Sequence, residues 1–232
     1  MPELDAAKEA AARAAAGLVE SGMRLGLGTG STTAIALREI ARRIREEGLD
    51  VVGVATSAAA EHLARQTGIP LCTLDDVDHL DLALDGADEV DPELNLIKGR
   101  GAAHTREKVI ARCAKRFVVL VDESKFVEQL GTRAAVPVEV LPMAVRPVER
   151  ELVRLGATVE LRNGSRKDGP VVTDQGFWIL DARFDHIEKP SELDVLIKCI
   201  PGVLDHGIFV GMATDVFVGE AGGTLRRITA TR

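Results

Sequence analysis

Short apolar runs alternate with longer amphipathic stretches over the first half of the chain. The apolar runs are bounded by polar or glycine residues and predict buried strands: Arg24–Gly28, Val51–Ala55, Leu80–Asp85 and Phe117–Val121. The stretches around them repeat apolar residues at helical spacing and predict helices: Leu4–Glu20, Thr32–Glu47, Ala58–Gln66 and Thr105–Ala114. Strands that alternate with helices are typical of βαβ units, so this half predicts an α/β fold with a doubly wound, parallel sheet.

The pattern changes after about Leu130. Prolines at 137 and 142 argue against a central strand in this region, because proline cannot donate a hydrogen bond to a sheet. Further along, helices are expected at Val145–Leu155 and from an N-cap at Ser191 to Cys199, and strands at Thr158–Leu161 and Val171–Asp181. This pattern predicts a small α+β domain of two helices on an antiparallel sheet.

The last segments predict a return to the first sheet, through Ile208–Val210, Asp215–Val218 and a glycine-rich hairpin to Ile228. We therefore predict two domains. The larger comprises residues 1–130 and 206–232, and the smaller α+β domain comprises residues 131–205.

Composition narrows the class of protein. The chain of 232 residues has a net charge of −7 and only 3% aromatic residues, which argues against nucleic-acid binding. Three scattered cysteines without a CxxC pair, a charged N-terminus and the lack of a long apolar run favour a cytoplasmic protein with no membrane segment. The five histidines lie far apart, so no metal site is expected.

Candidate chemistry is concentrated between Asp85 and Lys108. Four carboxylates fall within seven residues, at Asp85, Asp88, Glu89 and Asp91, where they repel one another unless ligands or cations separate them. The turn Lys98–Gly101 follows, with a cation and glycines that let backbone amides approach an anion. With Thr105 as N-cap, Glu107 would lie in the first turn of the next helix. An acid, a base and a cation at strand and helix ends indicate an active site.

A second motif, GLGTGSTT at 26–33, lies between a predicted strand and helix. Its glycines, hydroxyls and helix N-terminus suit an anion. A P-loop would need a lysine before the Ser/Thr, and a dinucleotide fingerprint would need glycine at Ser31 and an acid near Ala55. A single phosphate bound by Thr29, Gly30, Ser31 and Thr32 fits best.

Taken together, GLGTGSTT, DGADEVD and KGRGAAHTREK resemble ribose-5-phosphate isomerase, type A. The similarity continues through VVLVDESKF, AVPVEVLPMA and CIPGV, and so covers nearly the whole chain. The resemblance implies interconversion of ribose 5-phosphate and ribulose 5-phosphate without metal or cofactor, in the non-oxidative pentose phosphate pathway. It also implies a Rossmann-like larger domain, a smaller α+β domain, and a homodimer or higher homo-oligomer.

The resemblance also assigns site residues. Thr29–Thr32 match the phosphate turn, and Asp85, Gly86, Ala87 and Asp88 match the loop that holds sugar hydroxyls. Lys98, Gly99, Arg100 and Gly101 match the lysine and glycine turn, Glu107 the proton acceptor, and Lys125 and Lys8 further substrate-contacting lysines. The catalytic set is then Glu107, Asp88, Asp85 and Lys98, acting through an enediolate.

Arg100 departs from the family pattern, which usually has glycine there. We expect Arg100 to adopt an ordinary backbone conformation and leave unusual dihedral angles to Gly99 and Gly101. Its side chain should point outward, towards Glu89 or Asp91. His104, where an apolar residue is common, is expected to be structural or solvent-facing.

Two other classes remain open. A sugar-phosphate-sensing module of a transcriptional regulator would keep the phosphate turn but would not need Glu107. An acyl-CoA transferase-like enzyme would use a glutamate nucleophile, yet no site for a nucleotide tail is visible. Turnover of ribose 5-phosphate in EDTA separates the three.

Overall fold

The computed structural model describes residues 2–165 and 168–230, which form two compact units. The first takes its described residues from Met1–Ala87, Arg106–Lys125 and Met212–Arg232. The second comprises Asp88–Thr105 and Phe126–Gly211. The segment 88–105, which the predicted division assigns to the first domain, thus packs with the second unit.

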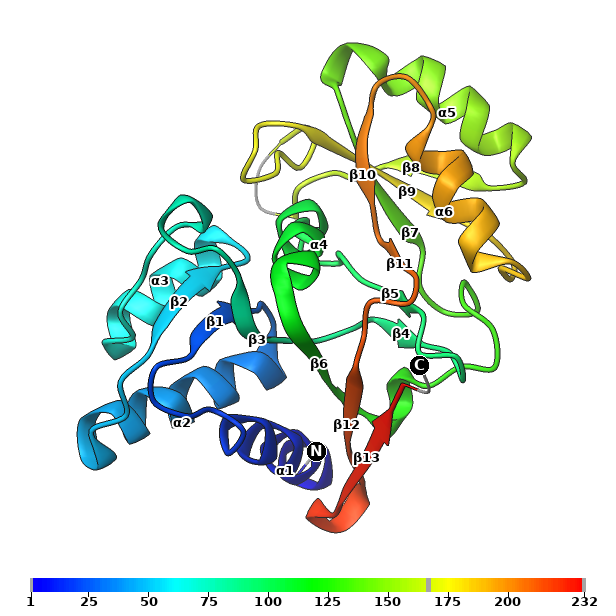
Figure 1. Cartoon of the computed structure of the whole chain (residues 1–232). Coiled ribbons are helices and arrows are strands. Elements are labelled where there is room, and N and C mark those ends of the chain that lie inside the picture. Colours follow the sequence, from blue (N-terminus) through cyan, green and yellow to red (C-terminus); the bar gives the residue numbers. More distant parts are fainter. Residues whose placement is uncertain (1, 166–167, 231–232) are drawn as a thin grey trace. The chain divides into compact units, whose positions relative to one another are not determined.

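A six-stranded sheet forms the centre of the first unit, in the order β13-β12-β6-β3-β1-β2 (Figure 1). Its strands are β1 (Arg24–Leu27), β2 (Val52–Ala55), β3 (Leu80–Asp85), β6 (Ala114–Asp122), β12 (Asp215–Gly219) and β13 (Leu225–Thr229). All neighbours pair in parallel except β12 and β13, which form the antiparallel hairpin at one edge. The predicted α/β fold with a mostly parallel sheet is confirmed.

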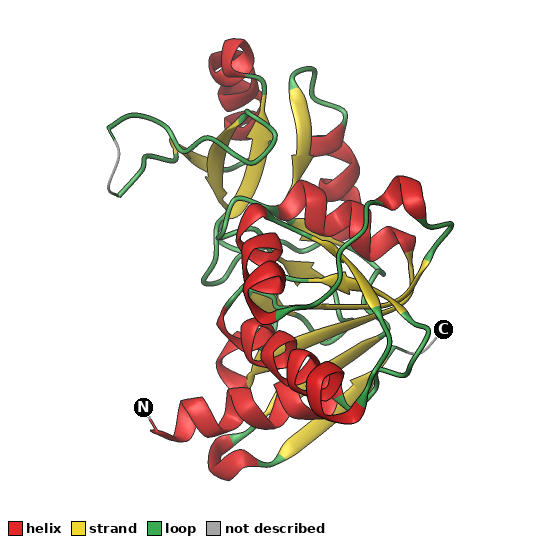
Figure 2. Ribbon diagram, turned by 90° about the vertical axis from the view of Figure 1, so that its left-hand side faces the viewer, coloured by secondary structure: helices red, strands yellow, loops and turns green. Residues whose placement is uncertain are grey.

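Helices pack against this sheet, as Figure 2 shows with strands in yellow and helices in red. They are α1 (Pro2–Ala16), α2 (Ser31–Glu47), α3 (Ala58–Thr67) and α4 (His104–Cys113). Alanines of α1, the apolar face of α2 and Ala64 share one core with the β1, β3 and β6 side chains. Ile110 of α4 lies against Gly26 of β1, where an added Cβ would be 2.6 Å from it. Gly48 and Gly68 end α2 and α3 in left-handed conformations, as their positions predict.

The second unit contains an antiparallel sheet in the order β10-β7-β9-β8, with α5 (Val145–Arg154) and α6 (Pro190–Lys198) packed on a shared apolar core. Its strands are β7 (Val136–Val140), β8 (Thr158–Leu161), β9 (Trp178–Arg183) and β10 (Val203–His206). A three-stranded sheet joins β4 (Glu89–Val90), β5 (Leu96–Ile97) and β11 (Ile208–Phe209). Short 3₁₀ helices complete the chain at Leu74–Asp76, Glu123–Lys125, Pro142–Ala144 and Ala221–Gly223.

The prediction that proline excludes a central strand at 137 is wrong. β7 lies between β9 and β10, and Pro137 pairs with Asp181. Proline is tolerated in β7 because the pairing of β7 with β10 ends at Val138, so no β10 residue needs an N–H from position 137. The carbonyl oxygen of Pro137 still accepts from Gly207 N at 2.8 Å.

Three other element predictions need correction. The strand expected over Val171–Asp181 is shorter, because only β9 forms in this region. The residues before β9 make a tight turn, in which Gly176 N donates to Thr173 O at 2.9 Å. Ser191 does not cap α6, since Pro190 already occupies the first helical turn. Ile208 pairs with Ile97 of β5 and not with the first sheet.

Membrane insertion receives no support from the helices. Among the residues that the structure describes, none forms a helix with the length and apolarity needed to cross a bilayer.

Asp215 of β12 connects the neighbouring strands β6 and β13 through side-chain hydrogen bonds. It is 2% exposed and accepts hydrogen bonds at 2.8 Å from Nε of Arg116 and Nε of Arg227. Burial alone would raise the pKa of Asp215, but the hydrogen bonds from Arg116 and Arg227 outweigh it and lower the pKa to about 2.

This network predicts a pH-dependent contribution to stability. Because the folded pKa of Asp215 lies below that of an unfolded aspartate, its stabilisation is complete above about pH 4 and is lost as the pH falls towards 2. Urea unfolding of the wild type and Asp215→Asn between about pH 2 and 6 should show a stability gap that closes at low pH. A gap of constant size would contradict the ionic origin.

Candidate functional site

The glycine-rich turn connects β1 to α2 and is shaped by close backbone packing. An added Cβ at Gly28 would lie 2.3 Å from the Leu84 carbonyl oxygen, so only glycine fits. Gly30 has a φ of 113° and provides no side-chain cap to α2. The N-terminal amides of α2, with the hydroxyls of Ser31 and Thr32, are therefore a suitable phosphate cradle.

Thr29 is held by hydroxyl groups that the sequence analysis did not assign to the site. Its Oγ1 lies 2.9 Å from Oγ1 of Thr56 and 2.6 Å from Oγ of Ser57. Both residues directly follow β2, and their place at a parallel strand's carboxyl end was the signal available. Ser57 also caps α3 by accepting from Ala60 N at 3.0 Å.

Asp85 links the phosphate turn to the sugar loop. It ends β3, is 2% exposed, and its Oδ1 accepts from Thr29 N at 2.9 Å and from Gly86 N at 2.8 Å. Two predicted site segments, separated by 56 positions in sequence, are thus joined by one carboxylate. Gly86 and Ala87 follow in half-buried positions.

Glu107 lies in the first turn of α4, as predicted, and is 5% exposed. The predicted N-cap at Thr105 is wrong, because α4 begins at His104. The hydroxyl of Thr105 is used elsewhere: it donates to Oε2 of Glu139, a buried residue of β7 that also accepts from the Thr173 hydroxyl. Glu139 therefore anchors the start of α4, a role without a local sequence signal.

The turn after β5 contains the predicted cation and glycines. Lys98 is 3% exposed, its backbone N donates to Gly207 O at 2.9 Å, and its Nζ lies 5.5 Å from the centre of the Phe209 ring. Gly99 has a φ of 104°, and an added Cβ there would be 2.7 Å from Nδ1 of His104. His104 is fully buried, so of the two expected roles the structural one is correct.

The predictions for Arg100 are confirmed in part. It is absent from the positive-φ residues of the described chain, and its side chain is 86% exposed. Gly99 supplies an unusual dihedral angle, but Gly101 does not; Ala102 does so instead, with a φ of 59°. The nearest carboxylate is Asp88, 3.9 Å from Nε of Arg100, and not Glu89 or Asp91.

Both expected partners of Arg100 are engaged inside the second unit. Glu89 is fully buried and accepts from three backbone amides of one loop, those of Gly131, Arg133 and Ala134, at 2.5–2.7 Å. Asp91 accepts from Asn95, and burial raises the pKa of Asp91. Asp88 accepts from the backbone N of Arg100 at 3.0 Å, which joins two further predicted site segments.

The remaining predicted lysines lie in the first unit. Lys8 is half-buried on α1, and Lys125 is half-buried at the end of the 3₁₀ helix after β6. The predicted residues Thr29–Thr32, Asp85–Ala87 and Glu107 also belong to this unit, whereas Asp88 and Lys98–Gly101 belong to the second.

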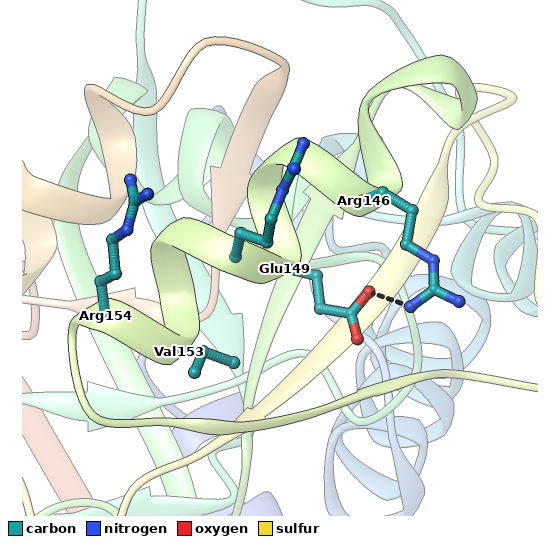
Figure 3. A pocket seen from close by; sticks show the side chains of 5 residues that line it. Arg146, Glu149, Val153 and Arg154 are labelled. Atoms are coloured by element: carbon teal, nitrogen blue, oxygen red, sulfur yellow. Dashed lines mark hydrogen bonds and ion pairs between the residues drawn. The ribbon is translucent and has the colours of Figure 1, made fainter.

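A surface pocket on α5 contains none of the predicted site residues. It is lined by Arg146, Glu149, Arg150, Val153 and Arg154, which extend from successive turns of one helix (Figure 3). Arg146 and Glu149 pair across it at 3.0 Å. For metals, no cluster of three or more His, Cys, Asp or Glu side chains suited to an ion occurs within 2–165 and 168–230.

Comparison with known proteins gives a consistent result. The family model described as Ribose 5-phosphate isomerase A (phosphoriboisomerase A) matches residues 52–223. The ribose-5-phosphate isomerase A of Thermosynechococcus vestitus is 57% identical over 214 residues, which cover 92% of this chain and 91% of the relative.

Solved structures agree in fold. The ribose 5-phosphate isomerase A of Methanocaldococcus jannaschii is 46% identical with a TM-score of 0.92, covering 97% of this chain and 98% of that one. A D-ribose-5-phosphate isomerase in complex with phospho-erythronic acid is 44% identical with a TM-score of 0.94, covering 97% of this chain and 99% of that one.

Proposed function

Because the chain belongs to the ribose 5-phosphate isomerase A family and is such an isomerase, we propose how its residues carry out the reaction. The proposed reaction interconverts D-ribose 5-phosphate and D-ribulose 5-phosphate through an enediolate, with Glu107 as the base and no metal ion. The observation that carries this proposal is the buried Glu107 in the first turn of α4, directly after the lysine and glycine turn.

The proton transfer requires one carboxylate. Glu107 removes the proton from C2 and returns it to C1 on the same face of the intermediate, a general base contribution of about 10²–10⁴-fold. A helix N-terminus stabilises an ionised carboxylate and weakens it as a base, whereas exclusion of water acts in the opposite direction. Both effects act on Glu107, because it lies in the first turn of α4 and is 5% exposed.

The enediolate carries negative charge on its oxygens. Lys98 and the amides of the Gly99–Gly101 turn supply the stabilising donors, each contributing on the order of 3 kcal/mol. Asp85 and Asp88 orient the sugar hydroxyls and assist opening of the furanose ring. Binding of the phosphate by Thr29–Thr32, with Lys8 and Lys125, provides energy for positioning away from the reacting carbons.

The ligand of one relative supports this chemistry. Phospho-erythronic acid, bound in a solved isomerase of similar fold, has a phosphate at one end and a carboxylate at the other. The two carboxylate oxygens share a negative charge in a plane, as the oxygens of an enediolate do. The phosphate of such a ligand suits the phosphate turn of this chain, and its carboxylate suits the Lys98 turn.

The direct test of the function is conversion of ribose 5-phosphate to ribulose 5-phosphate by the purified chain in EDTA. Turnover unaffected by the chelator is the expected result. Loss of turnover that added divalent metal restores would contradict the metal-free mechanism, and no turnover under any condition would contradict the function.

The phosphate assignment predicts a substrate-dependent effect. Ser31→Ala together with Thr32→Ala should weaken kcat/KM for ribose 5-phosphate by at least about tenfold, because two donors to the phosphate are removed. Turnover of free ribose, measured at high concentration, should change far less. Ser21→Ala, at a hydroxyl that accepts from Asp50 N at 3.0 Å, is a control in the same unit. An equal loss for both sugars would indicate a folding defect and contradict the assignment.

We further propose a cytoplasmic homodimer or higher homo-oligomer in the non-oxidative pentose phosphate pathway. Cys72, Cys113 and Cys199 are free thiols, as is usual in a reducing compartment. Met143, Val153, Val195 and Leu196 of the second unit are each more than half exposed, which supports a subunit interface there. Light scattering on the purified chain tests the oligomeric state, and a monomer at micromolar concentration would contradict it.

A further inference from the structure

Arg162 directly follows β8, and its guanidinium contacts two separate parts of the second unit. Its Nε donates to Oδ2 of Asp181 at 2.7 Å, and its Nη2 donates to Oδ1 of the same carboxylate. Its Nη1 donates to the carbonyl oxygens of Gly99 at 3.1 Å and Arg100 at 3.0 Å. The side chain is 17% exposed. One guanidinium thus ties strand β9 to the turn after Lys98.

Peptide geometry determines what this contact does to the turn. In a trans peptide the carbonyl and the N–H of the next residue point in opposite directions, and the described chain has no cis peptide. With the carbonyls of Gly99 and Arg100 directed at Arg162, the N–H groups of Arg100 and Gly101 point away from it. The N–H of Arg100 does point away from Arg162, because it donates to Oδ2 of Asp88 at 3.0 Å.

One peptide of the turn needs an external hold. The carbonyl oxygen of Gly99 also accepts from Ala102 N at 3.0 Å, which already fixes the Gly99–Arg100 peptide. The Arg100–Gly101 peptide ends in glycine, which restricts the backbone less than any other residue, so this peptide could rotate at low cost without the contact from Arg162 to the Arg100 carbonyl. Rotation of the Arg100–Gly101 peptide would exchange its N–H for a carbonyl and turn a donor for an oxyanion into a repelling acceptor. Only arginine offers the planar fork that binds a carboxylate bidentately while another nitrogen reaches two carbonyls.

We propose that Arg162, held by Asp181, is a positioning residue that keeps the amides of Arg100 and Gly101 on the Asp88 side of the turn, where the enediolate oxygens are stabilised. This role rests on the proposed function, because it assigns the Gly101 amide to the reacting oxygens. Arg162 itself acts only through the turn.

The test compares Arg162→Lys with Arg183→Lys. The first keeps the charge and loses the fork. The second is a control on the same sheet, since Arg183 is exposed and donates to the carbonyl oxygen of Arg133 at 3.3 Å. Arg162→Lys should lower kcat for ribose 5-phosphate by about 10- to 100-fold with KM changed less than about threefold, because an oxyanion donor acts in the transition state. Arg183→Lys should stay within about twofold of the wild type.

Two inhibitors separate positioning from general structural damage. Phospho-erythronic acid has the planar anion that the turn would stabilise, and erythritol 4-phosphate has an alcohol in its place. In Arg162→Lys the inhibition constant of the acid should rise about tenfold and that of the alcohol less than about threefold. Equal weakening of both inhibitors, or a change in KM without a change in kcat, would overturn the proposal.

A second variant keeps the test decisive if Arg162→Lys fails to fold. Asp181→Asn retains the side-chain size and weakens the hold on the guanidinium, so it should lower kcat at least about fivefold and weaken the acid more than the alcohol. Unchanged kcat in Asp181→Asn would overturn the proposal. A wild-type chain that does not isomerise ribose 5-phosphate would instead overturn the proposed function, which the same assay reports separately.

Discussion

Replacement of Glu107 by glutamine is expected to lower kcat for ribose 5-phosphate at least about 10²-fold, with KM little changed. Glutamine keeps the size and hydrogen bonding of the side chain but cannot accept the C2 proton. Because Glu107 is buried in the first turn of α4, the amide should occupy the same volume without rearranging the helix. The loss should therefore appear in the chemical step.

The measurement is the steady-state rate in both directions, together with the transfer of solvent deuterium to the product. Glu61→Gln is a matched control, because Glu61 also lies in the first turn of a helix, α3, but pairs with Arg65 at the surface. It should stay within about twofold, since surface substitutions have small effects. If Glu107→Gln retained activity within a few-fold of the wild type, another residue would have to be the base.

Replacement of Lys98 by methionine is expected to lower kcat/KM by about 10²–10³-fold. Lys98 is 3% exposed and its ammonium lies over the Phe209 ring, so the methionine stem should retain the packing while the charge is lost. A charge in so dry a site acts strongly on a developing enediolate.

The control for Lys98 is Lys189→Met, at an exposed lysine that pairs with Glu192. Thermal unfolding of both variants should separate misfolding from lost catalysis. A Lys98→Met enzyme with full kcat/KM and a normal melting temperature would remove Lys98 from the oxyanion site, leaving only the amides of the turn.

Local sequence chemistry was sufficient to predict much of the fold. Gly48 predicts the end of α2, and the predicted start at Thr32 lies one residue after the observed start at Ser31, because both ends depend on a few adjacent residues. The short apolar runs predict β1, β2 and β3 for the same reason. The first turn containing Glu107 was also predictable, although the start of α4 lies one residue earlier than expected.

The contacts that hold the site in place were not predictable in this way. Arg162 connects the carboxylate of Asp181 with the carbonyl of Gly99, which lies 63 positions from Arg162 in the sequence. Nothing near these residues in the sequence signals the pairing, because it depends on how β8 and β9 pack beside the turn. The acceptance of Pro137 in a central strand likewise depends on where β10 stops pairing.

The composition of the second unit has a consequence for the order in which the chain folds. Segment 88–105 receives one of its partners late in the chain, because β5 pairs with β11 and Gly211 N donates to Oδ1 of Asn95 across 116 positions. At roughly 5–20 residues per second, a ribosome takes on the order of 10 s to make the intervening chain. During synthesis β4 and β5 can pair with each other, but the other edge of β5 must wait for β11, whereas β1, β2 and β3 have already been made. The unpaired edge of β5 is therefore a place where the nascent chain can pair with another chain before β11 emerges.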